Sequence, residues 1–132
     1  MTARPTAQLD LDHDVTAPGA ARRFLAGVLG RWGASLETVE RSSLLASELV
    51  SNAVLHGGAP IQILVSSEDQ ASGVIRVEVT NVGSGRPLLR RANGNDLSGR
   101  GLQLIEDLAN GWGTESRNGQ IVVWFQIEPA EG

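Results

Sequence analysis

The sequence predicts an α+β two-layer sandwich, in which helices cover one face of a mostly antiparallel sheet. Several short segments alternate apolar and polar residues, as half-buried strands do. Two longer segments in the first half repeat apolar residues at three- and four-residue intervals, as amphipathic helices do. At 132 residues the chain has the length of one domain, which typically takes about 100–200 residues. We therefore expect a single domain over residues 1–132, with helices packed on one side of the strands.

The first half of the chain is expected to form one strand and two helices. Residues 7–13 alternate and predict a short strand with its acids outward. Thr16 can cap the helix that follows over residues 20–32, and Gly33 ends that helix. A second helix is expected over residues 35–56, where Gly57 and the residues up to Pro60 stop it.

The second half is expected to complete the sheet and to add one helix. The apolar patterning predicts strands at residues 61–65, 74–81, 112–116 and 121–127, and a helix at residues 99–109. Residues 66–73 are expected to be a turn-rich connection, and Arg117-Asn118-Gly119 is a good tight-turn sequence. Residues 81–98, rich in glycine and arginine, have no clean period, and long loops of this kind are usually functional or mobile.

Composition excludes several classes of function. The net charge of −4 argues against nucleic acid as a main partner. All eleven basic residues are arginine, which excludes a lysine-containing phosphate loop. There is no cysteine, and neither His13 nor His56 has metal-ligand spacing around it. No apolar run approaches the roughly 20 residues of a membrane span, and the acidic N-terminus does not resemble a signal peptide. A cytoplasmic protein without membrane or nucleic-acid partners is expected.

Three polar residues line up along the second predicted helix. Glu48, Asn52 and His56 have i, i+4 and i+8 spacing, so they lie close to one line on its surface. A carboxylate can take a proton while an amide oxygen four residues away coordinates a hard cation such as Mg²⁺. The alternative is that all three form the solvated stripe of an amphipathic helix, and His56 in particular can be a helix-ending residue that packs locally.

Two glycine-rich stretches could bind a ligand. Asn81-Val-Gly83-Ser-Gly85 ends a predicted strand, where glycine lets the backbone approach a planar ligand and a polar side chain can read its edge. Ser98-Gly99-Arg100-Gly101-Leu102 opens a helix, whose exposed N–H groups and positive dipole end attract anions. The alternatives are a ligand-free turn in the first case and a solvated loop followed by a capped helix in the second.

The order of these three stretches resembles the Bergerat-fold (GHKL, histidine-kinase-like) ATPases. ELVSNAVLHG is similar to the family's N box, NVGSG to its DxGxG box, and SGRGLQLIEDLANGWG to its last glycine box and the helix that follows. The closing GQIVVWFQI resembles the family's final strand. Within the family, the chain looks like the small stand-alone anti-sigma-factor serine/threonine kinases and their actinobacterial relatives. The resemblance covers nearly the whole chain and implies the Bergerat fold, with a lid loop at about residues 82–98.

The resemblance implies a role for each matching residue. Glu48 would be the general base that activates an acceptor serine, Asn52 would ligate the Mg²⁺ that bridges the ATP phosphates, and Asn81 would contact the adenine amino group. The residues that would shape the lid and the phosphate site are Gly83, Gly85, Gly99, Arg100, Gly101 and Leu102. The implied partners are a sigma factor and an anti-anti-sigma protein of the STAS type, and members of this group often form homodimers.

Asn81 departs from the family pattern, which has aspartate at this position. An amide oxygen can still accept the adenine amino hydrogen, but without the contribution of a full negative charge, a change of about 1 kcal/mol. The amide could also turn its NH₂ group toward the base and prefer another purine edge. The departure therefore bears on the preference for ATP.

The sequence leaves three functions open. The first is an ATP-dependent protein serine kinase that sequesters a sigma factor, favoured because both Glu48 and Asn52 are present. The second is a catalytically inactive switch module that binds nucleotide or a partner protein, favoured by Asn81. The third is a ligand-free α/β interaction domain, which requires all three polar stretches to be structural. A fragment of a sensor histidine kinase is disfavoured, because no dimerisation helix with a phosphoacceptor histidine precedes the domain.

Overall fold

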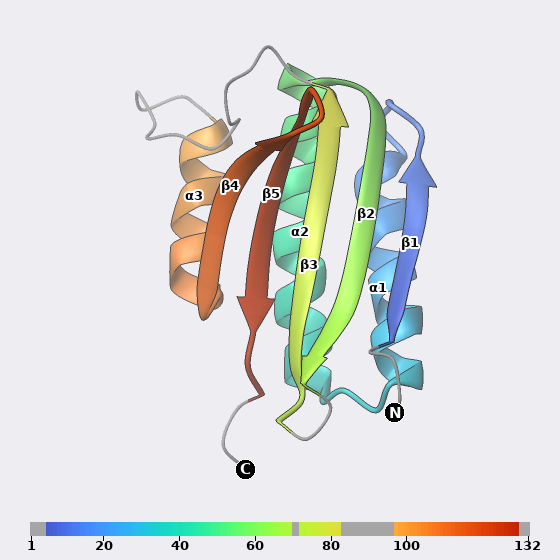
Figure 1. Cartoon of the computed structure of the whole chain (residues 1–132), viewed down its shortest axis with the longest axis vertical. Coiled ribbons are helices and arrows are strands. Elements are labelled where there is room, and N and C mark those ends of the chain that lie inside the picture. The colour runs from blue at the N-terminus through green and yellow to red at the C-terminus, as the bar shows by residue number, and fades with distance from the viewer. Residues whose placement is uncertain (1–4, 70–71, 83–96, 130–132) are drawn as a thin grey trace.

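The residues that the structure describes form a five-stranded sheet with three helices on one of its faces (Figure 1). A computed structural model describes residues 5–69, 72–82 and 97–129, with only the backbone described at residues 69 and 97–102. The elements, in chain order, are β1 (Thr6–Leu11), α1 (Ala17–Arg31), α2 (Leu36–His56), β2 (Gly58–Asp69), β3 (Val74–Val82), α3 (Leu97–Leu108), β4 (Gly111–Arg117) and β5 (Gln120–Ile127).

The strand order is β1-β2-β3-β5-β4, and each neighbouring pair in the described strands is antiparallel. Two of the four pairings, β2 with β3 and β4 with β5, join strands linked by a short turn, whereas β1 and β2 pair across the segment that contains α1 and α2. β3 and β5 pair across the segment that contains α3 and β4, so β5 lies between β3 and β4. The predicted two-layer α+β architecture, with helices on one face of an antiparallel sheet, is confirmed.

The hydrophobic core lies between the sheet and the helices. Alternate strand residues point toward the helices, so Ile63 of β2, Val79 of β3 and Phe125 of β5 are almost fully buried. The helices meet them with Leu29 and Leu49, among other apolar side chains of α1 and α2. The core therefore forms from the two apolar periodicities that the sequence displays, one of strands and one of helices.

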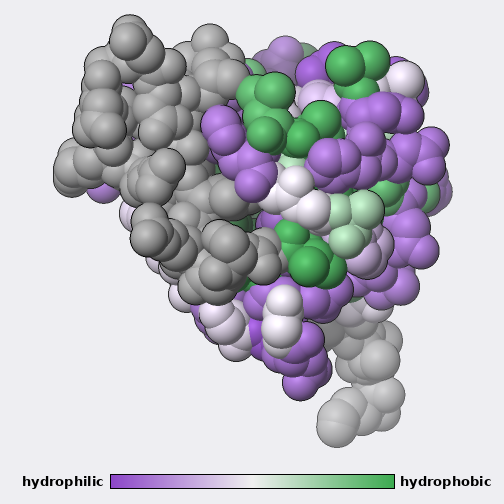
Figure 2. Space-filling model, turned by 90° about the horizontal axis from the view of Figure 1, so that it is seen from above, coloured by the Kyte–Doolittle hydropathy of each residue, from purple (hydrophilic) through white to green (hydrophobic). Residues whose placement is uncertain are grey.

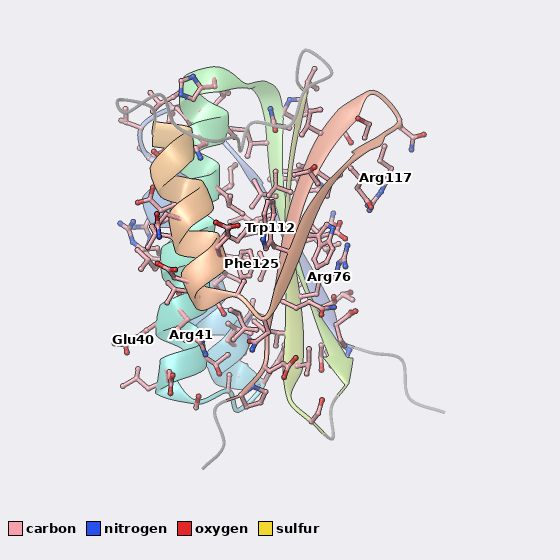
Figure 3. The ribbon with its side chains drawn as sticks, turned by 90° about the vertical axis from the view of Figure 1, so that its left-hand side faces the viewer. Glu40, Arg41, Arg76, Trp112, Arg117 and Phe125 are labelled. Carbon is pink, nitrogen blue, oxygen red and sulfur yellow. The ribbon has the colours of Figure 1, made fainter. Side chains whose placement is uncertain are left out.

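The opposite face of the sheet carries charged and aromatic side chains. Glu78 of β3 accepts hydrogen bonds from Arg76 Nε at 3.1 Å and from Arg117 Nη1 at 3.2 Å, and Arg117 also pairs with Glu115. The Arg76 guanidinium lies 4.2 Å from the centroid of the Trp124 ring. In Figure 3 the labelled Trp112 and Phe125 lie on the helix side of the sheet, whereas Arg76 and Arg117 project from its other side.

Several element boundaries differ from the sequence-based prediction. β2 begins at Gly58 rather than after Pro60, and it extends to Asp69 through residues expected to form a turn. The pairing of β2 with β3 shifts register between Gly58 and Ile61, and such an irregularity accommodates a proline that has no N–H to donate. Ser66 and Ser67 continue the strand because they pair with Arg76 and Ile75 of β3. β3 likewise runs one residue further than predicted, to Val82.

The first helix begins earlier than its apolar pattern suggests. Thr16 occupies the N-cap position, as predicted, but its side chain makes no capping bond to the helix backbone. Its backbone N–H and its hydroxyl both donate to Asp14 Oδ1, and these bonds lower the pKa of Asp14. Helix α1 starts at Ala17 because Pro18 in its first turn is already set to the helical φ.

Two predicted chain reversals are confirmed. Gly33, expected to end the first helix, follows α1 at φ +80°, and the next amide, that of Ala34, donates to Leu29 O. In the β4–β5 hairpin, Asn118 and Gly119 both adopt positive φ, at 53° and 79°, as a two-residue turn of this kind requires.

α3 starts at Leu97, two residues before the predicted Gly99, and ends at Leu108.

Candidate functional site

The polar residues of α2 lie in different environments. Glu48 is half-buried, Asn52 is 2% exposed, and His56 is exposed as the last residue of the helix. A solvated stripe, the structural alternative for these three residues, is therefore wrong for Asn52. Within the part of the chain that is described, the Nδ2 atom of Asn52 is buried and has no hydrogen-bond partner. A buried donor left unpaired costs about 1–3 kcal/mol, so this amide is poised to bind a group that supplies an acceptor.

Asn81 is buried at the end of the central strand. It is 1% exposed, lies between Ile61 of β2 and Ile121 of β5 in the sheet, and points to the helix side as Val79 does. Its Nδ2 donates to the carbonyl oxygen of Val82 at 3.1 Å. Because that oxygen can only accept, the amide nitrogen must face it, and the amide oxygen Oδ1 is turned away from it.

The loop between α2 and β2 lies directly against Asn81. A Cβ atom built on Gly57 would lie 2.0 Å from Asn81 Nδ2 and 2.9 Å from its Cγ, so only glycine leaves room for the amide. One built on Gly58 would lie 3.0 Å from the carbonyl oxygen of Val82. Gly57 thus leaves room for the buried amide, and Gly58 leaves room for the Val82 carbonyl that accepts from it, which together form a glycine cradle.

These features gather at one end of the molecule. In Figure 1 the C-terminal end of α2, the end of β3 and the N-terminal end of α3 all lie at the top. Figure 2 looks down on this end, where hydrophobic side chains interrupt a hydrophilic surface. Exposed apolar residues come from the elements that end here, Val15 before α1, Leu55 near the end of α2 and Val82 at the end of β3.

The remaining predicted site residues are described only in part. Gly99, Arg100, Gly101 and Leu102 lie in the first turns of α3. Because the helix begins at Leu97, Gly99 and Arg100 are among its first four residues, whose backbone N–H groups a helix leaves available to an anion. Gly83 and Gly85, together with most of the lid loop expected at residues 82–98, lie outside the described residues.

The polar groups at this end of the molecule suit a nucleotide with its cation. Asn52 can offer both an amide donor and an amide oxygen, Asn81 offers an oxygen acceptor beside a glycine cradle, and α3 offers N–H groups. No group of three or more histidine, cysteine or carboxylate side chains that could hold a metal ion occurs among the described residues.

Comparison with known proteins identifies the family. Residues 11–127 match the histidine kinase-like ATPase domain. The chain belongs to this family. That description implies ATP as the ligand, in agreement with the donor set of the site and with the resemblance in the N box and the glycine boxes. A comparison with curated protein sequences found no match.

Solved structures share the fold of this ATPase domain. The crystal structure of the RsbU and RsbW domains of Rv1364c from Mycobacterium tuberculosis matches with a TM-score of 0.72 and 22% identity, over 93% of this chain. The chain spans 32% of that protein. The histidine kinase domain of the blue-light activated histidine kinase from Erythrobacter litoralis EL346 matches with a TM-score of 0.55 and 21% identity, covering 83% of this chain and 59% of that one.

Two residues beside the candidate site, Gly57 and His13, were not predicted to be part of it. Gly57 was expected only to stop a helix, although its place as the last residue of the N box is a signal that could have been used. Nothing in the sequence indicated a role for His13 here, because its partner is 44 residues away in the chain: its Nε2 lies 3.0 Å from the carbonyl oxygen of Gly57.

In the described part of the chain, no helix is both long and apolar enough to cross a membrane.

Proposed function

We propose that this chain is an ATP-binding regulatory protein, an anti-sigma-factor-type serine kinase that phosphorylates a STAS-like partner and sequesters a sigma factor. The observation that carries this proposal is the pairing of half-buried Glu48 with buried Asn52 on consecutive turns of α2. Nucleotide binding alone needs no carboxylate at Glu48, whereas phosphoryl transfer uses a group that takes the proton of the attacking hydroxyl. We further propose that residues 1–132 act as a single cytoplasmic domain, without nucleic-acid or membrane partners and able to form a homodimer.

Each site residue has one proposed role. Glu48 accepts the proton of the partner's serine hydroxyl, and Asn52 holds Mg²⁺ through its amide oxygen while its Nδ2 donates to phosphate oxygen. The first turns of α3, with Gly99, Arg100, Gly101 and Leu102, face the phosphates, and Gly83 and Gly85 shape the lid. Bound ATP would supply the phosphoryl group that the serine receives.

Asn81 supports adenine rather than guanine as the base. Its Nδ2 is held by the Val82 carbonyl, so the atom available to a base is the acceptor Oδ1. Adenine presents an amino group to such an acceptor, whereas guanine presents a carbonyl oxygen at the same position, which would repel it. We expect Mg-ATP and Mg-ADP to bind more tightly than Mg-GTP by at least about fivefold, since an unmade hydrogen bond to a buried acceptor costs about 1–3 kcal/mol.

Calorimetric titration tests the binding half of the proposal. Wild type is titrated with Mg-ATP, Mg-ADP and Mg-GTP, and then with the adenine nucleotides in EDTA. The Asn52→Ala variant should lose the part of the affinity that depends on Mg²⁺, and it should keep the wild-type thermal unfolding midpoint to within a few degrees. Absence of binding at millimolar ATP would contradict the proposal.

Phosphoryl transfer tests the kinase half. With γ-labelled ATP and a STAS-type partner, wild type should label the partner, and Glu48→Gln should bind ATP normally while losing at least about a hundredfold in transfer rate. The second candidate function, an inactive switch module, is favoured by Asn81 at the position where the family has aspartate. Retained ATP binding with no labelled partner in wild type would establish that alternative.

A further inference from the structure

The junction between α2 and β2 is held from two directions at Gly57. The backbone N–H of Gly57 donates to Ala53 O at 2.9 Å, which closes the last turn of α2. Its carbonyl oxygen lies 3.0 Å from Nε2 of His13, which comes from the segment between β1 and α1. Both backbone polar groups of this glycine are therefore fixed, one by its own helix and one by a distant part of the chain.

The same glycine forms the wall against which the Asn81 amide rests. Its Cα lies so close that a Cβ would come within 2.0 Å of Asn81 Nδ2. The amide is held on its other side by Val82 O, at 3.1 Å from Nδ2. A displacement of Gly57 would thus open space beside Nδ2 and let the amide rotate, which would change the atom that Asn81 presents to a ligand.

We propose that His13 is a positioning residue for the base end of the site, acting through Gly57 on Asn81. The inference deepens the proposed function, because it assigns the base preference of the site to a side chain outside the N box and the glycine boxes. His13 holds the Gly57 carbonyl, and the Gly57 backbone lies directly against the Asn81 amide.

The chemistry of the contact fixes the form of the imidazole. A carbonyl oxygen only accepts, so Nε2 of His13 carries the hydrogen, which the neutral ring does in one tautomer and the protonated ring does in any case. A glutamine side chain can place an amide N–H near the position of Nε2, whereas alanine removes the donor.

His13→Ala and His13→Gln, compared by two measurements, test the inference. The first is the NMR signal of the Asn81 side-chain NH₂ group, together with the Gly57 and Gly58 backbone amides, in protein without nucleotide. The second is the ratio of the Kd values for Mg-ATP and Mg-GTP. His13 is exposed, so neither change should unfold the protein, which circular dichroism checks.

We expect His13→Ala to shift the Asn81 NH₂ signals, to weaken ATP binding about threefold to tenfold and to lower the preference for ATP over GTP, as loss of one hydrogen bond predicts. His13→Gln should restore both measurements toward wild type. Unchanged Asn81 signals in His13→Ala, or equal losses in both variants, would overturn the inference while leaving the proposed function intact. If wild type binds no nucleotide, the proposed function fails, and the NMR comparison alone decides whether His13 positions Asn81.

Discussion

At the scale of single residues, the contact between Gly57 and Asn81 is the tightest constraint on the site. In Gly57→Ala the new methyl carbon would lie 2.0 Å from Asn81 Nδ2, which is too close for the amide to stay where it is. We expect the free energy of unfolding to fall by about 1–3 kcal/mol, the usual cost of overpacking a filled site. Urea unfolding measures this change.

Gly30→Ala is the matched control for that substitution. Gly30 lies in α1, and a Cβ there would meet nothing within 4 Å. Alanine should therefore raise the free energy of unfolding, by about 0.4–1 kcal/mol, because it restricts the unfolded chain without a clash. Wild-type stability in Gly57→Ala would mean that the Asn81 amide can rotate aside at little cost.

The sequence could place Asn52 on a helix but could not tell whether it was buried. Helical spacing puts Glu48, Asn52 and His56 on one line of the helix, but the spacing is the same whether that face is exposed to solvent or buried. Which of these holds depends on what packs over the helix, and periodicity within one segment carries no information about its neighbours. The resemblance to ATPases gave the roles, whereas the burial of Asn52 came only from the fold.

At the scale of elements, α3 is fastened at its C-terminal end by a side chain of α2. Arg41 Nη2 donates to the carbonyl oxygen of Leu108, the last residue of α3, at 2.8 Å. Figure 3 shows Arg41 beside this end of the helix. The bond satisfies one of the carbonyls that a helix leaves unpaired and places positive charge at the negative end of its dipole.

Arg41→Met should remove this attachment while keeping much of the aliphatic stem. We expect a loss of about 1–2 kcal/mol in the free energy of unfolding, because the donor is charged and half-buried. Hydrogen exchange should accelerate most in the last turn of α3. The control is Glu37→Gln, which removes the exposed partner that lies 3.8 Å from Arg41 Nη1 and should change stability by less than about 0.5 kcal/mol. Equal losses in both variants would assign the effect to the surface ion pair.

Whether a segment forms a helix or a strand was predictable throughout the described chain, but the residues at which helices and strands begin and end were less predictable. Apolar periodicity identified each helix and strand because each has one face toward the core. The start of β2 at Gly58 was missed because glycine and proline normally interrupt strands, and only pairing with Val82 makes the strand begin there. Ser66 and Ser67 likewise join β2 through their partners in β3 rather than through their own preference.

At the scale of the whole molecule, the two faces of the sheet should contribute unequally to stability. Phe125 and Trp124 are neighbours in β5, but Phe125 is fully buried under the helices whereas Trp124 is half-buried on the other face. Trp124 rests across Gly113, where a Cβ would lie 2.9 Å from the indole, and under the guanidinium of Arg76.

Phe125→Ala should therefore cost about 3–5 kcal/mol, since it opens a cavity in the core. Trp124→Ala should cost about 1–2 kcal/mol, because the indole is partly hydrated already and its contact with Arg76 is worth about 0.5–1 kcal/mol. Chemical unfolding of both variants at one salt concentration compares them. A larger loss in Trp124→Ala would mean that the charged face, and not the core, holds the sheet together.

The strand order was the part of the whole fold that the sequence did not supply. An antiparallel sheet with helices on one face follows from the alternation of strands, helices and turns. The insertion of β5 between β3 and β4 depends on which strand edges meet after α3 has packed, and that pairing joins residues far apart in the chain.

The direction in which the strands run has a practical consequence. β1 starts and β5 ends at the lower end of the molecule in Figure 1, whereas the C-terminal end of α2, the end of β3 and the start of α3 lie at the upper end. An affinity tag, a fluorescent protein or a surface anchor fused at either terminus would be attached on the far side of the fold. The chain can therefore be immobilised by either end for binding measurements with the nucleotide site facing the solvent.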